Sequence, residues 1–473
     1  MRRVTINERD VTVVDNQTIV TDVVFVPGFA YGKTNGVALD TAVAPHVPTY
    51  CANTEDFFKF FGADAPIFNQ DQVYDDQAFA SNAIPSAEQG TDSVMFEAES
   101  VDPGYIYALE ILSAGLPVVF ERMNEETVPF EDNPNYDPTD PTSAKVLPVA
   151  GYDVTVDTAY TQFASIFNKD TSALMDKNGI SIKYLTSGGY PTFEYNDSAI
   201  AKAMQTLAAT RGDCIAFIDH TNNAERDLVG ANSVYGVDAA NIKSNLNVDA
   251  NGSYSAMITP WYTASLSNSY AGGNSTISSK AMPGSFAYLI SLASSLLTNA
   301  NWLAIAGVAR GRVPKLTNLC TDKVLTNTIA ENMTPIYGVA IDPITNIRPY
   351  GQTIWGNRTL LDTTSRSGYA TGFLNIRNLV CDVKKQAYVA AMSCMFEQNT
   401  DVLWINFKSM IQPMLEQMRS GGGLKNYKII KLPGSDRETI RAKIVLVPVY
   451  AVEQFIIDIY ITDSDVALSE VEA

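Results

Sequence analysis

The chain has 473 residues, which is too long for one hydrophobic core and predicts about three compact units. Hydrophobic residues make up 46% and charged residues 18%, which is ordinary globular usage and excludes a largely disordered chain. The 52 acidic residues outnumber the 33 basic ones, and the net charge of −19 argues against direct nucleic-acid binding.

Cysteine usage and hydropathy indicate the kind of compartment in which the chain folds. The five cysteines are Cys51, Cys214, Cys320, Cys381 and Cys394. They form no Cys-x-x-Cys pair, so we expect buried free thiols in a reducing compartment. Residues 1–10 lack the apolar run of a signal peptide. The longest apolar stretch, residues 286–309, is interrupted by Thr298, Asn299 and Asn301, so we expect no membrane insertion.

Residues 1–17 are predicted to be an extended arm. Val4 and Ile6 alternate with polar residues, and Val11 and Val13 follow a charged stretch, a pattern too polar to fold alone. Residues 18–28 are apolar on both faces and end in Pro-Gly, which predicts a buried central strand.

Helices and strands follow in alternation. Thr54 is predicted to cap a helix that ends at Gly62, and a second helix begins at Pro103 and ends at Gly115. The proline- and acid-rich residues 126–145 predict an exposed loop at a domain boundary. Beyond residue 180, the spacing of strands and helices indicates a parallel α/β sheet. The predicted elements there are strands at 180–189, 214–221 and 254–263 and helices at 198–211 and 285–299.

The character changes after about residue 346. Two amphipathic helices follow, and their apolar stripes are Val383, Ala387, Ala391 and Cys394, then Leu403, Phe407, Ile411, Leu415 and Met418. Pro413 predicts a bend or restart in the second helix. Two strands, at 442–450 and 455–462, end the fold, and an acidic tail follows. The last strand places Phe455, Ile457, Ile459 and Ile461 on one face.

Catalytic motifs find no support. GFAYGKT (residues 28–34) has three residues between its glycines where a phosphate-binding P-loop has four, and no helix pattern follows. We therefore expect a surface loop. His46 lies in a proline-rich loop, and His220 follows Asp219 at a strand end, where Glu225 is the one clear further metal ligand.

The acidic loop Glu131, Asp132, Asp137 and Asp140 matches a calcium loop in composition alone, because prolines replace the central glycine. We expect no catalytic residue, cofactor or metal.

A basic group stands out in this acidic chain: Arg419, Lys425, Lys428, Lys431, Arg437, Arg441 and Lys443. It is either a solvated face or a contact patch for an acidic partner.

The C-terminal half resembles the tail sheath proteins of contractile-tailed phages. The motifs that carry the resemblance are IDPITNIRPYGQTIWGNRTL (341–360), LNIRNLV (374–380), MFEQNTDVLWINF (395–407), LEQMRSGGGLKNYKI (415–429) and VPVYAVEQFIIDIYI (447–461). Upstream, RGDCIAFIDHT, YSAMITPWY and WLAIAGVARGRVPKL follow in the family's order. The chain departs from the family's Pro-x-Glu-Phe-Ile near the end, and residues 64–100 and 124–180 have no match.

The resemblance implies an α/β chain: an α+β core plus an inserted α/β domain, in a multidomain sheath-subunit architecture with extended terminal arms. The implied units are an N-terminal arm (1–17), a first core segment (18–124), an inserted outer α/β domain (125–345), a second core segment that faces the tube and exchanges arms (346–462), and an acidic tail (463–473).

The implied function is mechanical. Subunits polymerise helically around a tail tube, exchange strands through Val4, Ile6, Val11 and Val13 and through the 455–461 strand, and contract to drive the tube through the host envelope for genome delivery. The implied partners are further copies of the chain, the tube protein, and baseplate and tail terminator proteins, in a virion tail assembled in the host cytoplasm. Arg419, Lys425, Lys428 and Lys431 are the candidate tube contact.

Three other interpretations remain open. The first is the sheath of a bacteriocin or another contractile injection system, which would use the same polymer mechanism. The second is an α/β nucleotide-binding enzyme that uses Lys33 or His220. The third is a shell protein that assembles without contracting.

Overall fold

A computed structural model describes residues 22–34, 37–66, 101–123, 130–132, 146–148, 162–193, 198–220, 239–249, 251–272, 275–319, 332–335, 337–364, 369–432 and 439–453. The eight predicted strand-exchange residues, in the 1–17 arm and the 455–461 strand, lie outside this set, as do Cys320, Glu225, Asp137, Asp140 and Arg437.

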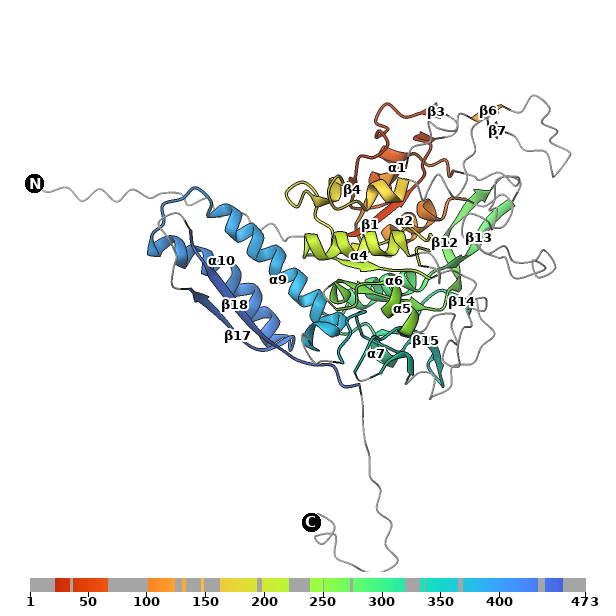
Figure 1. The fold of residues 1–473 in the computed structure, drawn as a ribbon. Helices are drawn as coiled ribbons and strands as arrows, with labels where there is room; N and C mark the ends of the chain where they lie inside the picture. Colours follow the sequence, from red (N-terminus) through yellow and green to blue (C-terminus); the bar gives the residue numbers. More distant parts are fainter. Residues whose placement is uncertain are drawn as a thin grey trace, which may run out of the picture.

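A six-stranded sheet forms the centre of the molecule (Figure 1). In order across the sheet, the strands are β10 (Ser255–Ala256), β9 (Ile215–Phe217), β8 (Tyr184–Leu185), β1 (Val24–Gly28), β5 (Val118–Arg122) and β4 (Thr49–Cys51). All neighbours pair in parallel except β4, which runs antiparallel to β5 at the edge. The apolar run that ends in Pro-Gly therefore forms a central strand, as predicted.

Helices cover both faces of this sheet because the strands are apolar on both sides. Val24 and Val26 of β1 belong to one hydrophobic cluster with helices α2 and α6. Val23 and Phe25 belong to another cluster with helix α4 on the opposite face. These helices are α2 (Pro103–Ser113), α6 (Gly284–Leu296) and α4 (Ala199–Arg211). We call this three-layer assembly the body, and it confirms the predicted α/β class.

The first helix, α1 (Thr54–Phe61), begins one residue earlier than predicted. Asn53 is the N-cap, because its side chain accepts a hydrogen bond from the amide of Asp56, and Thr54 is the first helical residue. Gly62 ends the helix at φ 83°, as predicted. Asn and Thr are both good N-caps, so the sequence alone did not distinguish two neighbouring candidates.

Smaller sheets surround the body. They are β11 (Ile258–Thr259) with β15 (Asp342–Ile347) and β16 (Gly351–Ile354); β13 (Ser275–Met282) with β12 (Tyr262–Gly272) and β14 (Leu316–Leu319); β2 (Lys33–Thr34) with β3 (Val37–Ala38); and β6 (Phe130–Asp132) with β7 (Val146–Pro148). The chain also contains the short helices α5 (Ala239–Asn245), α7 (Gly307–Arg310), η2 (Ala173–Met175), η3 (Gly252–Tyr254) and η4 (Tyr369–Gly372).

The last elements stand beside the body as a separate layer, which we call the C-terminal unit (Figure 1). It contains α9 (Leu374–Ser393), α10 (Asp401–Ser420) and the antiparallel pair β17 (Leu424–Lys431) and β18 (Ala442–Pro448). Helix α10 runs through Pro413 without the restart that its sequence predicted. The N-terminal half of α9 is buried in the body, so α9 joins the two regions.

The main sheet joins chain segments that the sequence assigned to different domains. Strands β1, β4 and β5 come from residues 18–124, whereas β8, β9 and β10 come from residues 125–345. The boundary at residue 124 therefore runs through one continuous sheet. The larger division into core and outer domains stays a prediction.

Candidate assembly surface

The C-terminal unit has a small core of its own. The predicted stripe residues Ile411, Leu415 and Met418 of α10 are buried against Leu379 and Val383 of α9. Four strand residues pack partly buried on the same cluster: Tyr427, Ile429, Ile444 and Leu446. One face of the β17–β18 ribbon is thus held against the helices.

The other face of the ribbon is open. Every second residue of β18 is exposed on this face: Lys443, Val445 and Val447. Their partners across the ribbon are Ile430, Lys428 and Asn426 of β17. Among the described residues, no third strand pairs with either edge of this ribbon. An open edge presents unpaired backbone donors and acceptors to a further strand.

The helices carry an exposed apolar surface at the end far from the body. Its members are Val389 and Met392 of α9, Met395 and Phe396 of the connection, and Val402 and Ile405 of α10. Phe396 is held out in solvent at a left-handed φ of 66°. Exposed apolar residues gathered in one helix–connection–helix segment make it a candidate protein interaction surface. We call these six residues the apolar tip.

The structure separates the four candidate tube-contact residues. Arg419 at the end of α10 pairs with Glu416 at 2.8 Å, with both side chains about half exposed. Lys431 lies on the helix side of the ribbon, 3.5 Å from Asp401. Lys425 and Lys428 are exposed and make no ion pair with another described residue. Lys428 alone is on the open face of the ribbon with Lys443.

The segments that lead to the predicted exchange strands leave the described fold at two fixed points. At the N-terminal end, Asp22, with 15% of its side chain exposed, belongs to an ion cluster with Lys183 and Asp382. At the C-terminal end, Glu453 pairs with Arg358 at 2.5 Å, and Arg358 lies over the Phe373 ring. Both exits are therefore anchored on the folded chain.

The glycine-rich segment at residues 28–34 does not have the chemistry of a phosphate site. The amide of Phe29 donates to the buried carboxylate of Asp102 at 3.2 Å, so an acidic group occupies the position where an anion would bind. Burial raises the pKa of Asp102 to about 6, although hydrogen bonds from Tyr190, Tyr105 and Phe29 oppose the shift. The segment is only partly the expected surface loop, because Gly28, Phe29 and Ala30 are buried. Lys33 is exposed in β2.

The two histidines lie in different settings. His46, at φ 60°, is 3.6 Å from Glu121, and burial raises the pKa of Glu121 to about 7. His220 is buried, and its carbonyl accepts from the Trp261 indole at 2.6 Å. Burial also raises the pKa of the adjacent Asp219 to about 7, against two hydrogen bonds from Ser285.

Two residues of the predicted acidic loop and four of the five cysteines are among the described residues. Glu131 and Asp132 lie in β6, paired with β7. Cys51, Cys214 and Cys381 are buried free thiols, as predicted, whereas Cys394 is only half-buried. Among the described residues, no group of three acidic, histidine or cysteine side chains could hold a metal ion. None of the helices in the described portion of the chain has the length and apolar character needed to cross a membrane.

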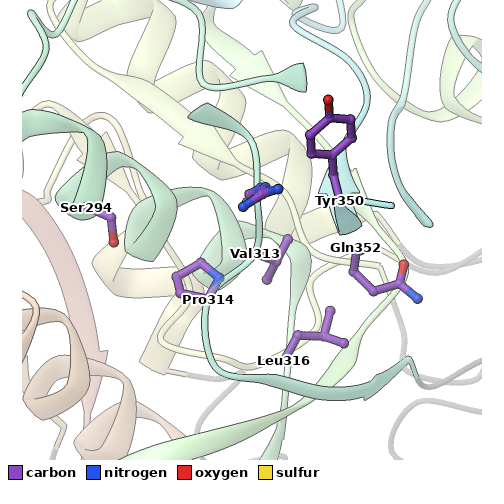
Figure 2. A pocket seen from close by; sticks show the side chains of 8 residues that line it. Ser294, Val313, Pro314, Leu316, Tyr350 and Gln352 are labelled. Atoms are coloured by element: carbon purple, nitrogen blue, oxygen red, sulfur yellow. The ribbon is translucent and has the colours of Figure 1, made fainter. Parts of the chain in front are cut away.

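A pocket of about 510 Å³ lies at the turn between β15 and β16 (Figure 2). Val313, Pro314 and Leu316 form its apolar side, and Tyr350, in the β15–β16 turn, and Gln352, in β16, also line it. The Arg312 guanidinium lies 5.1 Å from the centre of the Tyr350 ring. The pocket contains no titratable side chain other than this arginine and tyrosine, so it lacks an acid–base pair.

Comparisons with known proteins place this fold in a class. The structural match to a chain from the contracted baseplate of the anti-feeding prophage covers 98% of this chain and 98% of that one, with a TM-score of 0.59 and 15% identity. The match to a chain from the contracted sheath complex of an extracellular contractile injection system (PVC) covers 94% of this chain and 92% of that one, with a TM-score of 0.53 and 16% identity. The fold is thus one found in contractile injection systems.

A sequence relative narrows this class. The tail sheath protein of Vibrio phage KVP40 is 25% identical over 176 residues, which are 36% of this chain and 25% of that protein. The match therefore spans a quarter of the relative's length. No family model matches the chain. The resemblance to contractile tail sheath proteins, first drawn from the C-terminal motifs, is confirmed.

Sequence reasoning missed two features of this surface. The apolar tip was missed because its residues lie off the core stripes of α9 and α10, where an apolar residue is easily dismissed as noise. Val402 and Ile405, three residues apart on α10, were the available signal. Strand β17 was missed because lysines interrupt its alternation.

Proposed function

We propose that this chain is the sheath subunit of a contractile tail, which polymerises helically around a tail tube and contracts to drive the tube through a host envelope. One observation carries the proposal. The C-terminal unit exposes an apolar tip and a two-stranded ribbon that has no third strand among the described residues, on a chain whose fold matches contractile-system proteins along nearly its whole length. The chain has no enzymatic role and no cofactor in this proposal.

Subunits are linked by strand exchange. The arm residues Val4, Ile6, Val11 and Val13 of one subunit, and Phe455, Ile457, Ile459 and Ile461 of another, add to the open edges of the β17–β18 ribbon of a neighbour. The main-chain hydrogen bonds of added strands supply affinity, and the alternating apolar side chains supply register. Because donor and acceptor surfaces differ, the contact is head-to-tail and propagates as a helix.

Contraction follows from the same links. The extended sheath is a metastable polymer held by a kinetic barrier and by its end proteins at the baseplate and the tail terminator. After release, the bodies rotate as rigid units and pack more tightly, while the exchanged strands keep neighbours connected. The stored energy comes from assembly, so no nucleotide is consumed.

The C-terminal unit faces the tube. Lys425 and Lys428, which are exposed without an ion-pair partner among the described residues, meet acidic groups on the tube and set the register. Arg419 and Lys431, which already have acidic neighbours, contribute less. The tube protein, the baseplate and the terminator are the proposed partners, in a virion tail assembled in the host cytoplasm.

Negative-stain microscopy of the purified chain tests assembly. We expect sheath-like helical tubes from the full chain, and folded monomers without tubes after deletion of residues 1–17. Circular dichroism of the deleted chain is the folding control. Normal tubes from the deleted chain would contradict strand exchange, and persistent monomers of the full chain would contradict polymerisation.

Charge reversal tests the tube contact. Lys425→Glu with Lys428→Glu should lower co-sedimentation of the sheath with tubes, whereas Lys169→Glu, next to Asp170 on the body, serves as the control. Equal co-sedimentation of both variants would remove the basic contact from the proposal.

A sheath of a bacteriocin or a cell-derived injection system is the alternative within the same class, since the two solved relatives belong to such systems. Packaged genomes in purified particles would favour the phage tail. A nucleotide-binding enzyme is the alternative from another class. Titration of the monomer with ATP should give no binding, and micromolar affinity would revive that alternative.

A further inference from the structure

A buried ion cluster joins three segments that are far apart in the chain. The Lys183 ammonium lies 2.8 Å from Asp22 Oδ1 and 2.9 Å from Asp382 Oδ1. The Lys183 side chain is fully buried, and 15% of the Asp22 side chain and 3% of the Asp382 side chain are exposed. The Asn301 amide donates to both carboxylates, at 3.1 and 3.0 Å. Two acids thus share one lysine and one amide.

The electrostatics show that the cluster is charged at neutral pH. Burial lowers the pKa of Lys183, but Asp22 and Asp382 outweigh it and raise that pKa overall. Burial pushes the pKa of Asp22 up, and Lys183, Asn301 and Tyr184 bring it below the ordinary value. The pKa of Asp382 is raised because it is the more deeply buried acid. Lys183 and Asp22 are therefore both ionised in the folded chain.

The cluster lies at a junction. Asp22 lies two residues before β1, and residues 1–21 precede it. Asp382 is in the middle of α9, whose remaining residues extend into the C-terminal unit. Lys183 is itself fixed, because its amide donates to the carbonyl of Val23 at 2.8 Å and its carbonyl accepts from Ile215. The cluster thus ties the start of the β1–β8 strand pair to α9, the helix that leads into the C-terminal unit.

Stability alone is a poor reason for such a cluster. Desolvation of buried ions costs several kcal/mol per ion, and apolar replacements of similar volume are often as stable. A three-point ionic contact with hydrogen bonds differs from apolar packing in being directional. It holds two segments in one relative orientation, which apolar side chains at the same positions would fix less tightly.

We propose that Lys183 is a positioning residue that holds the root of the N-terminal arm in a fixed orientation against α9. Resting on the proposed function, this gives the arm and the ribbon of each subunit a fixed geometric relation. The arm of one subunit then meets the ribbon of the next in one register. The link survives the rotation of the bodies because the arm is held by α9 of its own subunit and the ribbon packs on α9 and α10 of the next.

Hydrogen exchange of the unassembled full chain tests the proposal. Asp22→Asn removes one charge and keeps one of the two oxygens that accept from Tyr184 and Asn301, so the chain should fold. We expect the amides of Val23 and Val24 and those of residues 382–393 to exchange about tenfold faster, as in a local opening. Strands β5 and β9 should be unchanged. Asn301→Ala, which alters no charge, should give a smaller change at the same amides.

The pair Lys243–Asp362, 2.7 Å apart, provides the control, because Asp362→Asn breaks an ion pair that shares no residue with the cluster. The Lys243 side chain is 60% exposed and the Asp362 side chain 8% exposed. It should leave the Val23 and Val24 amides unchanged. Unchanged exchange in Asp22→Asn, or a uniform rise that includes β5 and β9, would overturn the proposal. The measurement uses monomers, so its failure is distinct from a failure of strand exchange, which the 1–17 deletion reports.

Discussion

The body and the C-terminal unit differ in how completely each buries its apolar residues. In the body, β1 is buried along its whole length and helices cover both faces of the sheet. In the C-terminal unit, α10 buries four residues of its twenty, and the ribbon is largely exposed. The body buries its apolar strands within one chain, whereas the C-terminal unit leaves apolar residues exposed that a partner would cover.

In the proposed function, this difference separates two demands on a sheath subunit. A region that transmits force has to stay rigid, which close packing on two faces provides. A region that links neighbours has to keep apolar area and strand edges available, so these are exposed to solvent in the monomer. Substitutions in the two regions should therefore change different measurements.

Phe120→Ala should have the largest effect on stability. Phe120 packs against Phe57 and Phe61 with ring centres 5.0 and 4.7 Å apart. Loss of a buried aromatic ring costs about 3–5 kcal/mol. Urea denaturation followed by circular dichroism should show this loss in one transition. Phe396→Ala, the same change in the apolar tip, should shift the midpoint little.

Leu415→Ala should destabilise the C-terminal unit by about 2–5 kcal/mol, because Leu415 is fully buried in its core. Since that core is separate from the clusters of the main sheet, hydrogen exchange should rise in α10 and β17 while β1 and β5 stay protected. Leu297→Ala, at an exposed leucine, is the matched control. Equal deprotection of the main sheet would mean that the two regions unfold together.

Asp219→Asn should reveal a pH dependence of the body. Burial raises the pKa of Asp219 to about 7, so folding favours its protonated form. Its contribution is fully present below the unfolded pKa of about 4 and is lost as pH rises through 7. The variant should therefore be more stable than the natural chain at pH 8, and the gap should close near pH 4. Asp170→Asn, at an exposed acid, should show no such gap in urea titrations.

Ile405→Glu should have the smallest effect on stability and a large effect on assembly. Ile405 is exposed in the apolar tip, so the free energy of unfolding should change by less than about 0.5 kcal/mol. A buried charge at a subunit or tube contact is costly, so tubes should fail to form in electron micrographs. Gln417→Glu, on the exposed face of the same helix, should assemble normally. Normal tubes from Ile405→Glu would exclude the tip from the contacts.

Local patterns in the sequence were enough for much of the fold. The doubly apolar run before Gly28 predicted β1, Pro103 and Gly115 predicted the ends of α2, and the Leu403-to-Met418 stripe predicted the buried face of α10. These features depend on neighbours within a few turns of chain.

The rest depends on contacts that local patterns do not encode. Nothing near Lys183 indicates that Asp22 and Asp382 flank it, because the partners are 161 and 199 residues away. The pairing of β1 with β8 likewise determines that residues 18–124 and 125–345 share one sheet. The sequence indicated the C-terminal region as the candidate assembly surface, but the residues of the apolar tip required the structure.

The Lys183 cluster also has a consequence for synthesis of the chain. The ribosome releases Asp22 early, but Lys183 follows much later and Asp382 only after four-fifths of the chain. Growing chains fold in the order in which segments emerge. The ion cluster therefore cannot form until Asp382 of α9 has left the ribosome. In the proposed sheath, a nascent subunit thus presents an oriented arm only when it is nearly complete.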